Sequence, residues 1–303
     1  MSVSQATLSR RESFLAPLAA LVIGAVAMGI SPIFVRSADV GPFASAFWRV
    51  ALALPALYAW MRAAAPQGAV EARFSRASLL AGLAFAADLF FWHLSIVTTS
   101  VANAAFFATT APLWVVFFGW LFLKRRPTPG TLAGLTLCLI GGGALLAQSL
   151  QLKPEGAIGD LLALITGVFF GLYFLAVEAA RRFASAARVT FEASLITAAA
   201  LLPVALVLNG TLLPHTLKGA LALCAMAWIS HMGGQGLLSL ALGRLPAAFS
   251  SLVIFLEAVA AAGFGYLLLN EPVSPVQAAG GLLILAGIYV ARPRVAGRAP
   301  KRT

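Results

Sequence analysis

The sequence predicts an all-α integral membrane protein with ten transmembrane helices, arranged as two inverted five-helix repeats. Three observations support this fold class. Hydrophobic residues make up 61% of the 303 positions and charged residues only 10%, whereas a soluble domain carries about 25% charged residues. Ten apolar runs follow one another with short connections, and the mean hydropathy is +0.93. A pattern of prolines and glycines in the first half recurs in the second.

The ten apolar runs are the predicted transmembrane helices. Crossing the hydrocarbon core of a bilayer takes roughly 20 helical residues, and the runs are close to that length. Pro or Gly stands in several connections, where helices are expected to end. The runs cover residues 14–35, 44–61, 78–98, 102–123, 130–148, 159–178, 190–208, 219–242, 247–269 and 276–291.

The repeat has a period of about 145 residues. Its matching pairs are Pro112 with Glu257, Pro127 with Pro272 and, after a one-residue insertion, Pro129 with Pro275 and Gly134 with Gly280. We therefore expect a single membrane domain over residues 1–303. It would consist of a first repeat at 14–148, a second at 157–292 and a basic cytoplasmic tail at 293–303. Five helices per repeat is an odd number, so the second repeat is inverted, which places a substrate site at the interface near the midplane.

The basic residues indicate the orientation. If the N-terminus is cytoplasmic, 17 of the 21 Lys and Arg residues fall in cytoplasmic segments, as the positive-inside rule requires. Both termini are then cytoplasmic. The net charge of +11 does not indicate nucleic-acid binding, because no loop is long enough to hold a binding domain and the arginines flank apolar runs.

Two carboxylates are expected at bilayer depth. A charged side chain there costs about 2.5–3.5 kcal/mol on insertion scales, so it should face protein or water. Asp88 lies near the middle of the third run and Glu257 near the middle of the ninth. Asp88 shares a helix face with Trp92, whereas His93 is turned away by about 140°. Asp88 and His93 therefore cannot form a local acid–base pair.

Polar and aromatic side chains on other runs complete a candidate site, which we expect to be mostly apolar with a few hydrogen-bonding groups. Such a cavity suits a small amphiphile. The candidate substrate-binding residues are Asp88, Trp92, His93, Asn103, Phe107, Thr110, Tyr173, His231, Gln235 and Glu257. Packing roles stay open for these residues: Glu257 could hold a buried donor, and either histidine could be a hydrogen-bonded core residue. We expect Arg49 to pair with Asp39 or to extend outward rather than bind a ligand.

Several motifs resemble those of a known family. Phe47-Trp48-Arg49, the Arg126-Pro127-Thr-Pro129 stretch after Pro112, and Glu271-Pro272 after Glu257 are similar to the EamA-type exporters of the drug/metabolite transporter superfamily. The resemblance covers about residues 14 to 292. It is strongest to bacterial inner-membrane exporters of aromatic and other neutral amino acids, which also export paraquat. The family often has an acidic residue where this chain has Arg126, whereas the second half keeps Glu271 at the matching position.

The resemblance implies an inner-membrane exporter of amino acids or similar small metabolites that works by alternating access. Its expected partners are a small-molecule substrate and the lipid bilayer, without nucleic acid or cofactor, and the expected unit is a monomer. A multidrug exporter of lipophilic or quaternary cations is the main alternative. A phosphate-ester exchanger would need Lys or Arg inside the third, fourth, eighth and ninth runs to pair with the phosphate. The interiors of these runs have none. An enzyme would need a nucleophile–base or metal motif, and we find none.

Overall fold

The structure is a computed structural model that describes residues 3–64, 73–96, 98–99, 101–147, 154–208, 211–269 and 272–293. Its regular secondary structure in these ranges is entirely helical. Nine helical segments there are long and apolar enough to cross a membrane, and the shorter apolar helix Pro275–Ala291 provides a tenth. The predicted all-α membrane fold with ten helices is confirmed. Glu271 and positions 294–303 of the expected tail lie outside the described residues.

Three of the first five spans are interrupted helices. The spans are α1 (Val3–Gly29) with α2 (Ser31–Ser37), α3 (Pro42–Ala51) with α4 (Leu54–Ala63), α5 (Arg76–Ile96), α6 (Val101–Ala108) with α7 (Ala111–Leu121), and α8 (Pro129–Leu146). Pro32, Pro55 and Pro112 each stand in the first turn of the segment after a break. Proline has no N–H to donate to the preceding turn, so the helix stops there and restarts.

The second five spans contain two irregular helices. The short 3₁₀ helix η1 (Pro154–Gly156) leads into α9 (Ala157–Ala180), and α10 (Ala186–Leu208) follows. The eighth span comprises α11 (Leu217–Ala225), the π-helix η2 (Met226–Gln235) and α12 (Gly236–Leu242). The ninth and tenth are α13 (Ala247–Val253) with α14 (Leu256–Leu269), and α15 (Pro275–Ala291).

The fourth and ninth spans break at equivalent points of the repeat. The fourth is interrupted at residues 109–110 and the ninth at 254–255, which is the same separation that relates Pro112 to Glu257 in the sequence. Glu257 has no proline ring, and the ninth span nevertheless breaks. The repeat therefore preserves the interruption itself and not the residue type.

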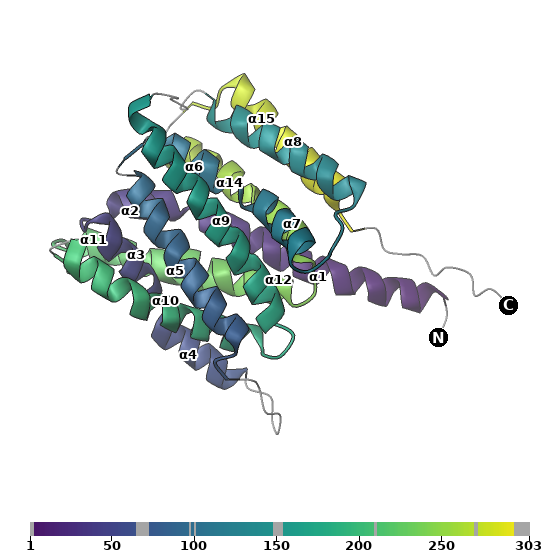
Figure 1. Ribbon diagram of the computed structural model, residues 1–303, viewed down its shortest axis with the longest axis horizontal. Helices are drawn as coiled ribbons and strands as arrows, with labels where there is room; N and C mark the ends of the chain where they lie inside the picture. Colours follow the sequence, from purple (N-terminus) through teal and green to yellow (C-terminus); the bar gives the residue numbers. More distant parts are fainter. Residues whose placement is uncertain are drawn as a thin grey trace.

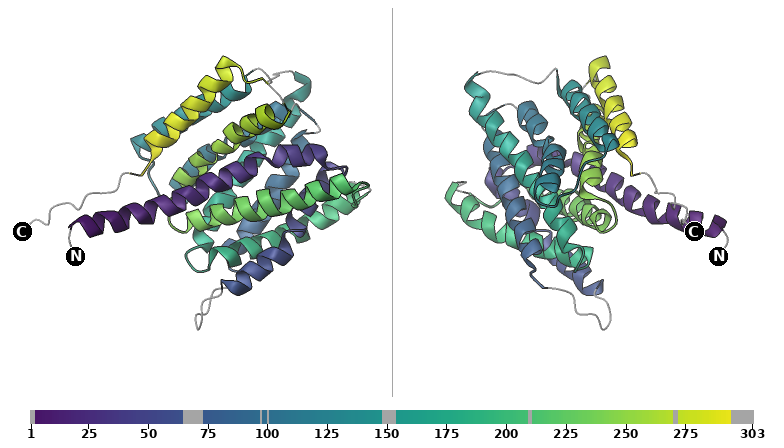
Figure 2. Two further views of the ribbon diagram at one scale, coloured as in Figure 1. Left: turned by 180° about the vertical axis from the view of Figure 1, so that it is seen from behind. Right: turned by 45° about the vertical axis from the view of Figure 1, so that its right-hand side comes forward.

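Helices far apart in the sequence lie side by side. Helices α8 and α15 pack along one another at one edge of the bundle (Figure 1). Their axes approach closely because glycines face backbone: a Cβ on Gly134 would lie 2.5 Å from the carbonyl oxygen of Gly287. Close packing of this kind stabilises helix association in a bilayer, where the hydrophobic effect does not drive helices together. Helix α1 runs past α12, α14 and η2, and the three long helices α5, α9 and α10 form an adjoining layer (Figure 2).

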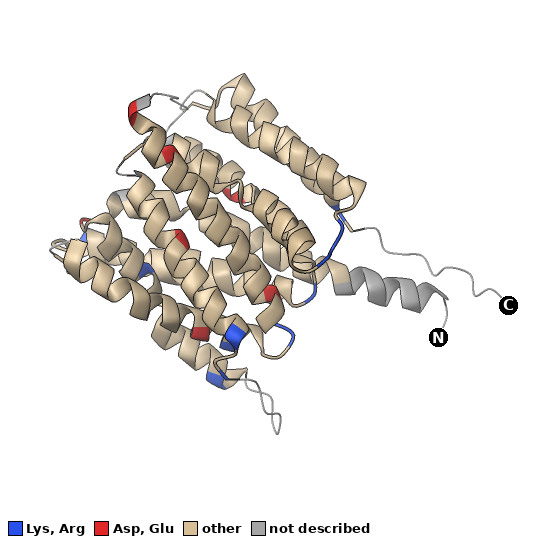
Figure 3. Ribbon diagram, viewed as in Figure 1, with Lys and Arg blue, Asp and Glu red and all other residues tan. Residues whose placement is uncertain are grey.

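The described basic residues concentrate at one end of the bundle (Figure 3). This end carries the outer part of α1, the C-terminus of α15 and the connections that contain residues 64, 73–75, 122–128, 181–185 and 243–246. We call it the basic end. The two exceptions among the described Lys and Arg side chains are Lys218, which starts the eighth span at the opposite end, and Arg49, which lies inside the bundle.

Candidate functional site

A cavity of about 170 Å³ lies between the two halves of the bundle. Ligand pockets usually measure about 300–1,000 Å³, so this one suits a small solute. Its wall is mostly apolar and aromatic, with a few polar groups. The side chains that line it include Ser31, Arg49, Phe85, Asp88, Trp92, Thr109, Pro112, Thr166, Phe170, Phe174, Gln235, Ser251, Phe255 and Glu257.

The fourth and ninth spans both contribute to this cavity at their breaks. Thr109 and Pro112 come from the interruption of the fourth span, and Phe255 and Glu257 from that of the ninth. Interrupted helices free backbone N–H and C=O groups, which membrane proteins tolerate only where the backbone lines a cavity or is buried in protein. The repeat thus positions the cavity, because breaks from both halves meet there.

Three charged side chains from three spans face this space. Arg49 of α3 is 8% exposed and Asp88 of α5 is 7% exposed, while Glu257 of α14 is partly buried. Arg49 interacts electrostatically with both carboxylates, but among the described residues none of the three belongs to an ion pair within 4.0 Å. The buried Nε of Arg49 also has no hydrogen-bond partner there. The charges therefore remain free to contact a ligand.

The position of Arg49 corrects one expectation. Its side chain neither pairs with Asp39 nor extends outward, because it is buried and lines the cavity. Asp39 instead accepts a hydrogen bond of 3.0 Å from the backbone N–H of His215, at the end opposite the basic one. The sequence signal was present, since an arginine within an apolar run is costly unless protein or water surrounds it.

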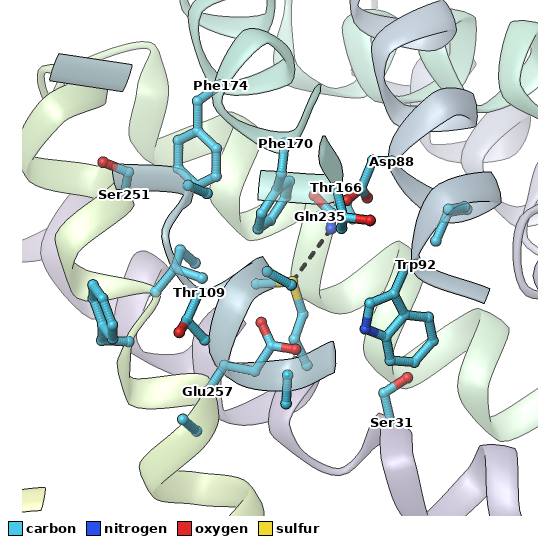
Figure 4. Close-up of a pocket in the computed structure, with 18 of the residues that line it drawn as sticks. Ser31, Asp88, Trp92, Thr109, Thr166, Phe170, Phe174, Gln235, Ser251 and Glu257 are labelled. Atoms are coloured by element: carbon cyan, nitrogen blue, oxygen red, sulfur yellow. Dashed lines mark hydrogen bonds between the residues drawn. The ribbon is translucent and has the colours of Figure 1, made fainter. Parts of the chain in front are cut away.

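Asp88, Trp92, Gln235 and Glu257 all line the cavity, and each was among the predicted site residues. Figure 4 shows them around one space, with Asp88 and Trp92 on α5, Gln235 on η2 and Glu257 on α14. Gln235 is oriented from both sides: Tyr173 donates a 3.0 Å hydrogen bond to its Oε1, and its Nε2 donates to the sulfur of Met28 at 3.3 Å. Tyr173 thus stands behind the cavity wall and positions Gln235. Whether these residues bind substrate stays a prediction.

The two predicted histidines lie outside the lining. His93 is 2% exposed, and its Nδ1 donates to the carbonyl oxygen of Leu89 at 2.6 Å, within its own helix. His231, in the π-helix, is 1% exposed; its Nε2 is hydrogen-bonded to Ser194 Oγ at 2.8 Å, and its ring stacks on Phe85. Phe85 lines the cavity, so His231 supports the wall from behind.

Three residues of the fourth span face a neighbouring helix instead. Asn103 donates a 2.8 Å hydrogen bond to Asp160 of α9. The hydroxyl of Thr110 bonds the carbonyl of Phe107, and both residues lie against Gly167, where a Cβ would come within 2.6 Å of Thr110 Oγ1 and 3.1 Å of the Phe107 oxygen. Because Gly167 has no side chain, this face of the fourth span packs closely against α9. The adjacent face of the span, with Ala105, Ala108 and Thr109, therefore lines the cavity.

Other lining residues had no distinctive sequence signal. Ser31, Thr166 and Ser251 are buried hydroxyl residues on three different spans. Serine and threonine occur throughout apolar runs, where they bond their own helix backbone; Thr166 does so, donating to the carbonyl of Leu162. Phe170 and Phe174 lie one turn apart on α9 and supply the aromatic wall. Only the assembled bundle distinguishes these residues from others of their kind.

Comparisons with known proteins agree with this architecture. The chain is 26% identical to the pseudopaline exporter CntI of Pseudomonas aeruginosa over 79% of its length and 82% of that protein. It is 29% identical to the threonine/homoserine exporter RhtA of Escherichia coli over 70% of its length and 68% of that protein. A solved crystal structure superposes with a TM-score of 0.79 and 19% identity, covering 93% of this chain and 97% of that one, which shows the shared fold.

A family match then covers both halves of the molecule. Residues 15–146 and 157–292 each match the EamA-like transporter family. These two segments contain the cavity-lining spans and both helix breaks. The protein is thus a multi-pass membrane transporter with a small-molecule substrate, and it belongs to the EamA-like transporter family.

Proposed function

We propose that this protein exports small zwitterionic metabolites, foremost neutral amino acids, by alternating access of the central cavity. The observation that carries the proposal is the set of three charges in a small apolar space. Arg49 offers a cation, while Asp88 and Glu257 offer carboxylates. An α-amino acid has both complements, a carboxylate and an ammonium group.

The geometry assigns each group a role. The fork of Arg49 suits a carboxylate, which arginine binds through two parallel hydrogen bonds. Asp88 and Glu257 would receive the ammonium group from two different spans, α5 and α14. Trp92 and Phe170 form aromatic wall beside these charges, and their π faces can also contact an ammonium group. The remaining apolar surface would hold an uncharged side chain.

The relative named a threonine/homoserine exporter supports a substrate of this class, and a second relative is named a pseudopaline exporter. The cavity volume of about 170 Å³ also favours a compact solute over a bulky drug. Both relatives are under 30% identical to this chain, so the choice among amino acids rests on the cavity.

The charge distribution supports one orientation of the protein in the membrane. The basic end would face the cytoplasm, since Lys and Arg accumulate on the cytoplasmic side of membrane proteins. Both termini would then be cytoplasmic, in a bacterial-type inner membrane. The lining spans contribute Ser31, Trp92 and Thr109 from their halves nearer the opposite end. Phe174, Gln235 and Ser251 line it from the halves nearer the basic end, so the cavity lies near the middle of the bundle.

Export of lipophilic or quaternary cations is the second candidate. The observation in its favour is that carboxylates outnumber arginines in the cavity, with aromatic rings beside them. Arg49 argues against it, because a buried guanidinium repels a cationic substrate at short range. The two functions predict opposite roles for Arg49. It would bind the carboxylate of an amino acid, but it would weaken the binding of a dication.

Efflux from proteoliposomes tests the proposal. Vesicles containing the purified protein are loaded with labelled threonine or phenylalanine, and the loss of label is followed with and without a proton gradient. We expect faster loss than from protein-free vesicles, and a gradient effect would separate proton antiport from facilitated diffusion. A matched set of vesicles loaded with paraquat covers the alternative. Paraquat loss without amino-acid loss would reject the proposed function and favour the cation exporter.

A further inference from the structure

A second and larger cavity lies at the basic end, apart from the central one. It has a volume of about 590 Å³ and is enclosed by α7, by residues 125–131 leading into α8, by the start of α13 and by the C-terminal end of α15. It therefore separates the α8–α15 pair from the rest of the bundle at this end. None of its lining residues lines the central cavity.

Three arginines line this cavity: Arg125, Arg126 and Arg292. Arg125 is neutralised by Glu178, to which it donates at 2.5 Å. Arg292 lies over the ring of Tyr289, 4.1 Å from its centroid. For Arg126 and Arg292 no carboxylate partner within 4.0 Å is found in the described part of the chain. The cavity thus carries two uncompensated positive charges, which favour an anion.

Aromatic residues place the arginines at headgroup depth. Trp120 is 52% exposed and Phe122 is 65% exposed, both at the end of α7 that precedes Arg125 and Arg126. Tyr289, which contacts Arg292, is 63% exposed. Large aromatic side chains gather at the boundary between hydrocarbon and headgroups. A guanidinium stacked on Tyr289 therefore lies where lipid phosphates lie.

The inner part of the same cavity is apolar. Val116 and Val290 line it, and Phe249 closes it towards the core. Gly119 is buried, yet a methyl group there would meet no atom of the described residues within 4 Å. Gly119 thus opens on empty space at hydrocarbon depth, which is suited to an acyl chain. A small soluble anion would make no favourable contact with this apolar part of the cavity.

We propose that this cavity binds one anionic phospholipid, with its phosphate on Arg126 and Arg292 and an acyl chain along Val116 and Gly119. Basic pockets between transmembrane helices are known to hold anionic headgroups. The lipid would fill the space between the α8–α15 pair and α7 and would hold them in register. The shape of the site, polar at the bilayer surface and apolar below, is that of the ligand.

Native mass spectrometry of the purified full chain, titrated with phosphatidylglycerol and separately with phosphatidylcholine, tests the site. We expect one retained phosphatidylglycerol and much weaker retention of phosphatidylcholine. The double variant Arg126→Gln/Arg292→Gln should weaken phosphatidylglycerol binding about 30-fold. The control Arg62→Gln/Arg244→Gln removes two exposed arginines from the same end but outside the cavity, and it should bind like the wild type. Equal retention of both lipids by the wild type would overturn the proposal.

Two further measurements separate lipid from a soluble phosphate. Gly119→Phe fills the apolar part, so it should weaken lipid retention several-fold while leaving any effect of inorganic phosphate on thermal stability unchanged. If millimolar inorganic phosphate displaces the lipid fully and Gly119→Phe has no effect, the site binds a free anion and the lipid assignment is wrong. Arg126→Lys/Arg292→Lys keeps both charges, so it should restore most of the binding if the Gln variant folds poorly. Because the readout is lipid retention, failure of amino-acid efflux leaves this result unaffected.

Discussion

The guanidinium of Arg125 donates a 2.5 Å hydrogen bond to the carboxylate of Glu178 and joins the first half of the chain to the second at the basic end. The other oxygen of Glu178 accepts the backbone N–H of Ala247 at 3.2 Å, at the start of α13. Val115 and Phe249 are buried and line the larger cavity at this end. We infer that this three-element link holds the basic end of the bundle closed around these two side chains.

Removing this link should open the basic end. Arg125 is 40% exposed, so its ion pair contributes less than about 1 kcal/mol, and the bond to Ala247 contributes about 1 kcal/mol more. We expect Glu178→Ala to raise the rate of thiol labelling at Val115→Cys about fivefold or more. These variants would be made in a protein whose two native cysteines, Cys138 and Cys224, have been replaced. Glu155→Ala, an exposed acid at the opposite end, is the control, and equal labelling in both variants would refute the link's role.

Arg49 should determine the affinity for the substrate carboxylate. A hydrogen bond to a charged group contributes about 1.5–3 kcal/mol, so Arg49→Gln should weaken threonine binding at least about tenfold. The measurement is the rise in melting temperature with added threonine, because a ligand that binds only the folded protein stabilises it. Threonine amide, which lacks the carboxylate, should stabilise the wild type and the variant alike. Lys218→Gln, an exposed lysine outside the cavity, should bind threonine normally.

The α8–α15 contact should tolerate no side chain at its glycines. A Cβ on Gly134 would lie 2.5 Å from the Gly287 oxygen and 2.6 Å from the Cβ of Ala291. Gly134→Ala should therefore destabilise the protein by about 1–3 kcal/mol, as overpacking does. Gly263→Ala is the matched control, because no described atom lies within 4 Å of a Cβ there and alanine is the better helix former. The stability of both variants is measured as the rate of thermal inactivation in detergent. An equal loss of stability in the two variants would contradict the close approach of α8 and α15.

Asp39 should give the end opposite the basic one a pH-dependent stability. Partial desolvation raises the pKa of its carboxyl, but hydrogen bonds from Thr216 and from the backbone of Asp39, Thr216 and His215 outweigh it and hold the pKa below its usual value. A carboxyl with a lowered folded-state pKa stabilises the protein above its unfolded pKa, about 3.9, and loses this effect as the pH falls through the folded value. The melting temperature of Asp39→Asn should therefore lie below that of the wild type at pH 6. The difference should shrink below about pH 4, and a constant difference would contradict this role.

Much of the fold could be predicted from the chain alone. Length and hydropathy of the apolar runs marked the spans, because the thickness of a bilayer sets the length of a crossing helix. The repeat even marked the cavity, since Pro112 and Glu257 flank two of the helix breaks that line it. Asp88 and Glu257 were identifiable because a carboxylate in an apolar run needs a polar space.

The tertiary structure decided which face of each helix turns inward. In a soluble protein the apolar stripe marks the buried face, but lipid tails are as apolar as a protein core, so this signal is weak in a membrane. Asn103 and Thr110 thus appeared to be site residues by their spacing, whereas Asp160 and Gly167 of α9 hold them at a helix contact. Arg49 was expected to pair with Asp39 or extend outward, whereas the packing of α3 beside the cavity turns its side chain into the cavity wall. The sequence by itself determined the spans, the repeat that relates them and the carboxylates within them. Close glycine contacts and buried hydrogen bonds, which join residues far apart in the chain, set the rotation of each helix and so the composition of the site.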